Sequence, residues 1–164
     1  MERYLSLLKE KGAAGAAVIH PKTVVTAPWV AFKCQYGCPH YGKNLCCPPH
    51  APAWRETRAM LDCFDTAILF CCRQMEQVNE LARAAARELF LQGYYKAVAL
   101  GSGPCLLCES CDLSGCRHPG QALPSMEACG IDVFATARAN GMAVETLADR
   151  DQPQNCFGLL LVKW

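Results

Sequence analysis

The sequence lacks the long apolar segments that would place it in or across a membrane. Its longest apolar runs, Ala67–Cys72 and Phe157–Val162, are far shorter than the roughly 20 residues that a membrane-spanning helix needs. The N-terminal segment 1–12 carries charges throughout and has no uninterrupted apolar stretch of the kind found in secretory signals. We therefore expect a cytoplasmic protein without a membrane partner.

The sequence also lacks a marked excess of either charge. Its 16 Lys and Arg residues nearly balance 15 Asp and Glu residues, which leaves a net charge of +1. Because nucleic-acid-binding domains usually carry a basic excess, we expect no nucleic-acid partner. There is no Walker loop, and Gly101-Ser102-Gly103 lacks the later glycine of a dinucleotide fingerprint. The sequence has no internal repeats or low-complexity segments, and its 164 residues match the length of one ordinary domain. We therefore expect a single domain over residues 1–164.

Cysteine, in contrast, is abundant, with 13 in the chain. A secreted disulfide scaffold would usually be shorter than 100 residues and would need an export signal, and the sequence meets neither condition. In a reducing compartment, dense cysteine more often serves a metal. The composition therefore favours a metal-binding protein.

Between its cysteine-rich segments, the chain shows the periodicities of helices and strands. Helices are expected over Tyr4–Lys11, Arg55–Phe64, Gln74–Leu91 and from Ser125 to about Asn140, the last with a break near Gly130. Extended segments are expected over Ala16–Ile19, Thr23–Phe32, Thr66–Cys72, Tyr95–Leu100, Ala143–Leu147 and Cys156–Val162. The stretch 66–100 has the length of a βαβ unit with parallel strands. We predict an α/β or α+β fold: a single mixed sheet, helices packed on it, and cysteine-rich loops at about 34–52 and 101–124.

The loop at 101–124 contains the stronger metal signal, GPCLLCESCDLSGCRHP. Cys105, Cys108 and Cys111 follow one another at two-residue gaps, and Cys116 comes four residues later. This spacing lets neighbouring thiolates converge while backbone amides point inward, and ferredoxin-type sites begin in the same way. A structural zinc site usually pairs two knuckles far apart in sequence. We therefore favour an iron–sulfur cluster here, with zinc as the alternative.

The loop at 34–52 has looser spacing, CQYGCPHYGKNLCCPPH. Cys34 and Cys38 are separated by three residues, and Cys46 and Cys47 are adjacent. Adjacent side chains point in different directions in an extended backbone, so we expect only one of the two to bind. We favour Cys47, because the two prolines that follow it restrict its backbone. The spacing does not match the cysteine triad of radical S-adenosylmethionine enzymes, and that reaction class is disfavoured.

The remaining cysteines divide into core residues and one reserve ligand. Cys63, Cys71, Cys72 and Cys156 lie on expected helices and strands, where cysteine behaves as a small apolar residue. Two four-iron clusters need eight thiolates, and the motifs above supply seven once Cys46 is set aside. The eighth ligand is left open between Cys46, Cys129, a histidine and an external ligand. His40, His50 and His118 lie near the cysteines and are either ligands or solvated loop residues.

These motifs resemble those of a family of small bacterial and archaeal proteins identified only as predicted metal-binding, domain of unknown function 2284. The matching stretches are KCQYGCPHYGKNLCCPP, GPCLLCESCDLSGCRHP and PSMEACGIDVFATARANG, in this order between about Val30 and Gly141. The resemblance implies metal binding without an established reaction, and Cys46 is an addition to the family's pattern. The cysteines onto which the family's ligands map are Cys34, Cys38, Cys47, Cys105, Cys108, Cys111 and Cys116.

Three functions fit these observations. The first is an iron–sulfur protein with two 4Fe–4S clusters that acts in electron transfer or as a redox accessory protein beside a redox partner protein. The second is an enzyme with a site-differentiated cluster, whose open iron position would bind substrate. The third is a zinc-stabilised interaction module. The sequence leaves open whether the protein is an enzyme.

Overall fold

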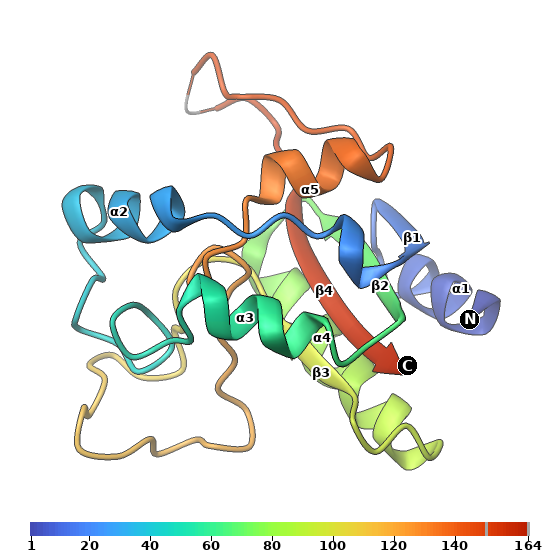
Figure 1. Ribbon diagram of the computed structural model, residues 1–164, viewed down its shortest axis with the longest axis horizontal. Coiled ribbons are helices and arrows are strands. Elements are labelled where there is room, and N and C mark those ends of the chain that lie inside the picture. Colours follow the sequence, from blue (N-terminus) through green and yellow to red (C-terminus); the bar gives the residue numbers. More distant parts are fainter. Residues whose placement is uncertain (150, 164) are drawn as a thin grey trace.

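The structure, a computed structural model that describes residues 1–149 and 151–163, is built around one four-stranded sheet (Figure 1). The strands are β1 (Gly15–Ile19), β2 (Thr66–Cys72), β3 (Val98–Leu100) and β4 (Cys156–Lys163), in the order β1-β2-β4-β3. The α-helices are α1 (Glu2–Glu10), α2 (Pro28–Gly37), α3 (Trp54–Leu61), α4 (Met75–Leu91) and α5 (Val133–Ala139), with a short 3-10 helix at Pro21–Thr23. The α+β class with a single sheet is confirmed.

The strands β2 and β3 are parallel, as expected of a βαβ unit, but β4 lies between them. The sheet is not mixed as expected, because every pairing of neighbouring strands is antiparallel. Leu159 of β4 is opposite Leu69 on one side and opposite Leu100 on the other, and both pairings are antiparallel. β1 also pairs antiparallel with β2. As a result, β2 and β3 run in the same direction without being bonded to each other. The apolar β4 is buried along nearly all its length, as a central strand must be.

The sheet is covered on both faces, and alternate residues of β2 belong to different cores. Ile68 and Phe70 pack with α1 and α4 on one face, whereas Leu69 and Cys71 pack with α3 and α5 on the other. Gly158 of β4 allows α4 to approach closely, because a Cβ there would lie 2.8 Å from the Val78 side chain of α4 and 2.6 Å from the Phe70 ring of β2. The α4 side of the sheet is therefore tightly packed, and the opposite face leads to the cysteine loops.

Three segments differ from the expected secondary structure. Thr23–Phe32 is not extended as a whole, because α2 begins at Pro28, whose fixed φ suits the first position of a helix. The described residues Ala143–Leu147 form no strand. The stretch 125–130, expected to be helical, is a turn, and beyond the expected break near Gly130 α5 begins only at Val133 with its N-terminus capped by Asp132.

A tight turn fills the interruption before α5. The Ser125 hydroxyl accepts a hydrogen bond from the Ala128 amide at 3.0 Å, and Gly130 adopts a positive φ of 73°. The turn then binds the segment before α2, since the Ala27 amide donates to the Gly130 carbonyl at 2.9 Å. This contact helps to fix α2, which carries Cys34 in its last turn.

No helix in the described part of the chain is both long enough and apolar enough to cross a membrane.

Candidate metal centre

The two cysteine-rich loops lie against each other at one side of the sheet (Figure 1). The buried side chain of Asn44 joins them, because its amide group donates to the Cys105 carbonyl at 2.8 Å. The same side chain accepts from the Cys46 amide at 2.8 Å. The Leu45 amide, between them, donates to the sulfur of Cys111 at 3.5 Å. The short segment 44–46 of the first loop thus fixes the position of the second loop.

The adjacent residues Cys46 and Cys47 belong to different groups of cysteines. Cys47 lines a cavity together with Cys34 and Cys38, and we call these three residues the first group. Cys46 lines a separate, smaller cavity with the four cysteines of the second loop. This second group consists of Cys46, Cys105, Cys108, Cys111 and Cys116. Cys46 and Cys47 therefore each lie near other cysteines, but near different ones.

The second group has the donors that a thiolate-bound metal needs. Its cavity is small, about 20 Å³. Backbone amides point at the sulfurs, since Leu45 donates to Cys111 and His118 donates to Cys116 at 3.4 Å. Burial, and then the neighbouring Cys105, raise the pKa of Cys46 to about 12, so a metal must displace its proton. A donor set of thiols with amide hydrogen bonds to sulfur suits soft metals and iron–sulfur clusters.

The first group combines a helix end with a turn. Cys34 lies in the last turn of α2, and the Cys38 amide donates to the Cys34 carbonyl at 3.2 Å. Cys47 is buried in a turn whose following amides, from His50 and Ala51, donate to its carbonyl. Burial first, and then the nearby Cys38 and Cys34, raise the pKa of Cys47 to about 11. These three thiols border a cavity of about 280 Å³.

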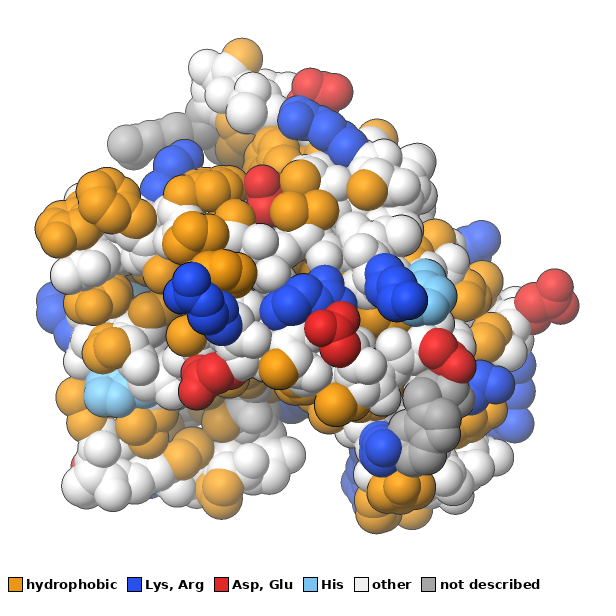
Figure 2. Space-filling model, in the orientation of Figure 1, with side chains coloured by type: hydrophobic (Ala, Val, Ile, Leu, Met, Phe, Trp, Pro, Cys, Tyr) orange, Lys and Arg blue, Asp and Glu red, His pale blue; other side chains and the backbone are white. Residues whose placement is uncertain are grey.

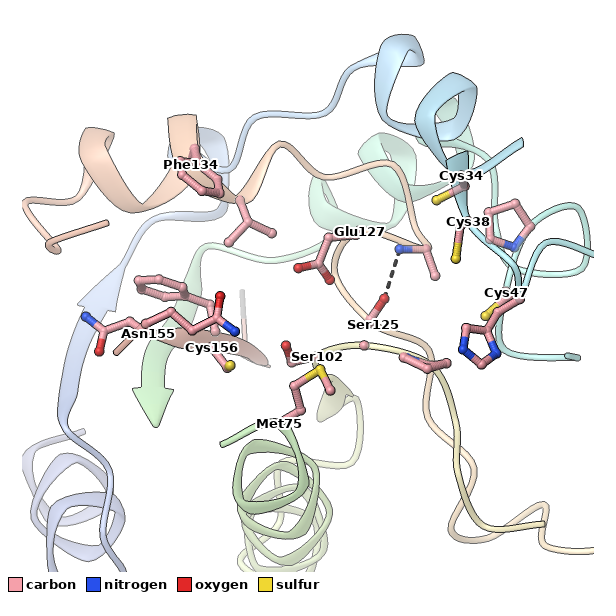
Figure 3. Close-up of a pocket in the computed structure, with 18 of the residues that line it drawn as sticks. Cys34, Cys38, Cys47, Met75, Ser102, Ser125, Glu127, Phe134, Asn155 and Cys156 are labelled. Carbon is pink, nitrogen blue, oxygen red and sulfur yellow. Dashed lines mark hydrogen bonds between the residues drawn. The ribbon is translucent and has the colours of Figure 1, made fainter. Parts of the chain in front are cut away.

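The far side of that cavity contains polar groups that belong to no cysteine motif (Figure 3). The Glu127 carboxyl group lies in the space between the first group and Cys156, and burial raises its pKa. Its Oε2 atom is shielded from solvent and has no hydrogen-bond partner. The available sequence signal was modest: one acidic residue in the otherwise uncharged segment 120–131.

The other candidate residues lie apart from the two groups or at their edges. Cys129 is fully buried in the core and lines neither cavity, and burial raises its pKa to about 12. His40 lines the cavity of the first group, His118 lines that of the second, and His50 lines neither. Among the described residues, no three Cys, His, Asp or Glu side chains converge on the position of a single metal ion.

Three of the four predicted core cysteines are buried, namely Cys71, Cys72 and Cys156. The prediction for Cys63 is wrong, because this residue is exposed just after α3. Its thiol donates to the Ala59 carbonyl at 3.4 Å and so has a hydrogen-bond partner four residues earlier in the chain.

Comparison with known proteins gives one match. No curated protein and no solved structure matches the chain significantly. The model of one protein family matches residues 17–162, which include the whole of both cysteine loops. The chain therefore belongs to the family described as predicted metal-binding protein (DUF2284).

Proposed function

We propose that this protein is an iron–sulfur redox protein with two 4Fe–4S clusters, one at each group of cysteines. The observation that carries the proposal is the division of the candidate ligands by Cys46 and Cys47 into two adjacent groups. Electrons would pass between the two centres and a redox partner protein. The proposed ligands are Cys34, Cys38 and Cys47 at the first group, and four of Cys46, Cys105, Cys108, Cys111 and Cys116 at the second.

The chain's own groups would stabilise a negatively charged cluster at the second group. A bound cluster supplies one-electron redox chemistry, whose potential depends on hydrogen bonds to sulfur and on solvent exposure. The amides of Leu45 and His118 already donate to cysteine sulfurs. Since Leu45 belongs to the first loop, docking of the two loops brings one of these donors into place.

Hydrophobic side chains gather on the surface over α2 (Figure 2), and this exposed surface supports the proposed contact with a redox partner protein. Trp29, Phe32 and Tyr36 recur at helical spacing on α2 and are 48%, 64% and 70% exposed. Cys34 lies on the same helix. Exposed apolar surface of this kind is typical of protein interaction sites.

A second candidate function is an enzyme that uses a site-differentiated cluster at the first group. The cavity beside Cys34, Cys38 and Cys47 favours it, because only three of the cysteines proposed as ligands reach this position. A cluster held there would have one iron without a cysteine ligand, open to a small molecule. Electron transfer and catalysis would then belong to different groups of the same protein.

Metal analysis of anaerobically purified protein tests the proposal. We expect a brown protein with about eight iron and eight sulfide per chain, the content of two 4Fe–4S clusters. Electron paramagnetic resonance of the reduced protein, with and without small ligands, would separate a sealed electron carrier from an enzyme with an open iron. A colourless protein with stoichiometric zinc and no iron or sulfide would contradict both iron–sulfur functions and favour the zinc-stabilised interaction module.

A matched pair of variants tests the proposed ligands. Cys38→Ser removes one of the three cysteines proposed as ligands at the first group, and should lower the iron content. Cys71→Ser changes a cysteine that is buried in the core away from both groups, and should keep the iron. The opposite result would overturn the division into ligands and core residues.

A further inference from the structure

The cavity beside the first group has a second wall that the cysteine motifs do not explain (Figure 3). Ser102 comes from the segment after β3, Glu127 from the turn before α5, and Asn155 from the segment that enters β4. The cavity measures about 280 Å³, close to the lower end of the range of small-molecule sites. Segments far apart in sequence thus converge on a space suited to a small organic ligand.

Two hydrogen-bond acceptors in this wall have no donor. In the described part of the chain, three buried side-chain atoms lack a hydrogen-bond partner: Thr57 Oγ1, Glu127 Oε2 and Asn155 Oδ1. Two of these three atoms belong to residues that line this one cavity. Buried polar atoms are nearly always hydrogen-bonded in folded proteins, so an unpaired acceptor facing a cavity indicates a missing donor. A ligand that supplies donors would satisfy both.

The charge and polarity of the lining restrict the ligand further. The described residues that line the cavity include the carboxyl groups of Glu127 and Glu145 and no Lys or Arg side chain. An anionic ligand would therefore meet like charge without a Lys or Arg side chain to compensate it, and His40 is at the wall formed by the first group. Met75, Val133 and Phe134 supply apolar surface on the same walls. The lining suits a molecule with a cationic donor at one end and an apolar body.

We propose that this cavity binds a small organic amine, whose nitrogen donates to Glu127 and Asn155 and whose apolar part packs against Met75, Val133 and Phe134. The binding itself needs only the residues of the cavity. The assignment of the amine as a substrate or effector of the first group rests on the proposed function, because Cys34, Cys38 and Cys47 form the opposite wall.

Calorimetric titration of the metal-loaded protein with three probes of similar size tests the ligand class. Phenethylamine is a cation with donors, phenethyl alcohol is neutral, and hydrocinnamate is an anion. We expect phenethylamine to bind with a dissociation constant of about 1 mM or tighter, the alcohol to bind about tenfold more weakly, and the anion not to bind. Failure of phenethylamine to bind, or equal binding of the anion, would overturn the proposal.

Variants locate the binding. Glu127→Gln keeps the shape of the side chain and should weaken phenethylamine binding about tenfold, because a hydrogen bond to a charged group is lost. Glu10→Gln makes the same chemical change at the exposed end of α1 and should have no effect. Phe134→Ala alters a partly exposed side chain and should weaken binding about fivefold even if Glu127→Gln folds poorly. Unchanged binding in both cavity variants would place the amine elsewhere.

Iron and sulfide measured on the same samples separate this inference from the proposed function. Amine binding in a protein that contains zinc and no sulfide would contradict the iron–sulfur function and leave the amine site standing. A protein with two clusters that ignores phenethylamine would contradict the amine site and leave the iron–sulfur function standing.

Discussion

At the scale of single residues, Cys46 and Cys47 are adjacent in sequence but lie in different groups. Cys47 lies beside Cys34 and Cys38, whereas Cys46 lies beside Cys105. Hydrogen bonds fix this divergence on both sides of the pair. The Asn44 side chain holds the Cys46 amide, and the Cys47 carbonyl accepts from the turn that follows. Cys46 could not move to the first group, nor Cys47 to the second, without breaking these hydrogen bonds. The pair thus assigns each of its members to one proposed centre.

The two adjacent cysteines should respond differently to the same substitution. Cys47→Ser leaves two cysteines at the first group, and we expect the loss of about half of the iron, the content of one of two equal clusters. Cys46→Ser leaves four cysteines at the second group, so we expect an iron content close to that of the wild type. Iron and sulfide analysis of the two variants, prepared side by side, makes the comparison. Equal loss from both would show that Cys46 is an indispensable ligand.

The residues of the candidate site differ in how far the sequence could predict them. The two-residue gaps of Cys105, Cys108 and Cys111 are local, and local spacing brings them to one small cavity. Glu127 and Asn155 are 28 positions apart, and only the folded chain brings them to the same cavity. No motif marks either residue. The exposure of Cys63 was missed because the residue lies just beyond the last turn of α3, where a helical pattern no longer holds.

At the scale of elements, the turn before α5 connects the core with α2 and α3. Gly130 has a φ of +73°, and its backbone lies against the start of α3. A Cβ at this position would lie 2.6 Å from the Cβ of Trp54 and 3.0 Å from its Cα. The next residue, Ile131, forms an isolated bridge with Thr26 ahead of α2. A side chain at Gly130 would therefore disturb several elements at once.

Gly130→Ala should lower the free energy of unfolding by about 2–5 kcal/mol, because left-handed backbone strain adds to a contact with the backbone of α3. Gly141→Ala is the matched control, with a similar φ of +70° and no atom within 4 Å of the added Cβ. Gly141→Ala should lower the free energy of unfolding only through left-handed backbone strain, by about 1–2 kcal/mol. Urea unfolding of the metal-loaded proteins measures both. Equal costs at the two positions would mean that the contact with Trp54 relaxes freely.

Elements were predictable from sequence where local pattern and tertiary context agree. Thr66–Cys72 was predicted with the bounds that the structure has, because a short apolar run next to an amphipathic helix has few alternatives. The segment around Trp29 has residues that favour strands, but Pro28 suits the first position of a helix, and the segment forms α2 instead. The place of β4 between β2 and β3 depends on a pairing across more than 80 residues, which periodicity does not reveal.

At the scale of the whole molecule, the sheet and the cysteine loops have different sources of order. Both faces of the sheet bury continuous apolar clusters that include residues of α1, α3, α4 and α5. The stretch 112–121 is largely exposed, and the second loop has no helix or strand of its own beyond the single bridge between Gly101 and Ser125. A metal would supply order that this loop cannot obtain from burial. The sheet, in contrast, has its own hydrophobic stabilisation.

Removal of the metal should therefore release the loops before it unfolds the sheet. Lys43 and Arg117 are exposed trypsin sites within the two loops, and Arg87 is an exposed site on α4. After anaerobic chelation, we expect rapid cleavage at Lys43 and Arg117, continued protection at Arg87, a lower melting temperature and a retained far-ultraviolet circular dichroism signal. Mass spectrometry of the digest identifies the cleavage sites. Equally fast cleavage at Arg87 would show that the sheet depends on the metal, whereas unchanged protection of the two loop sites would show that the metal does not order the loops.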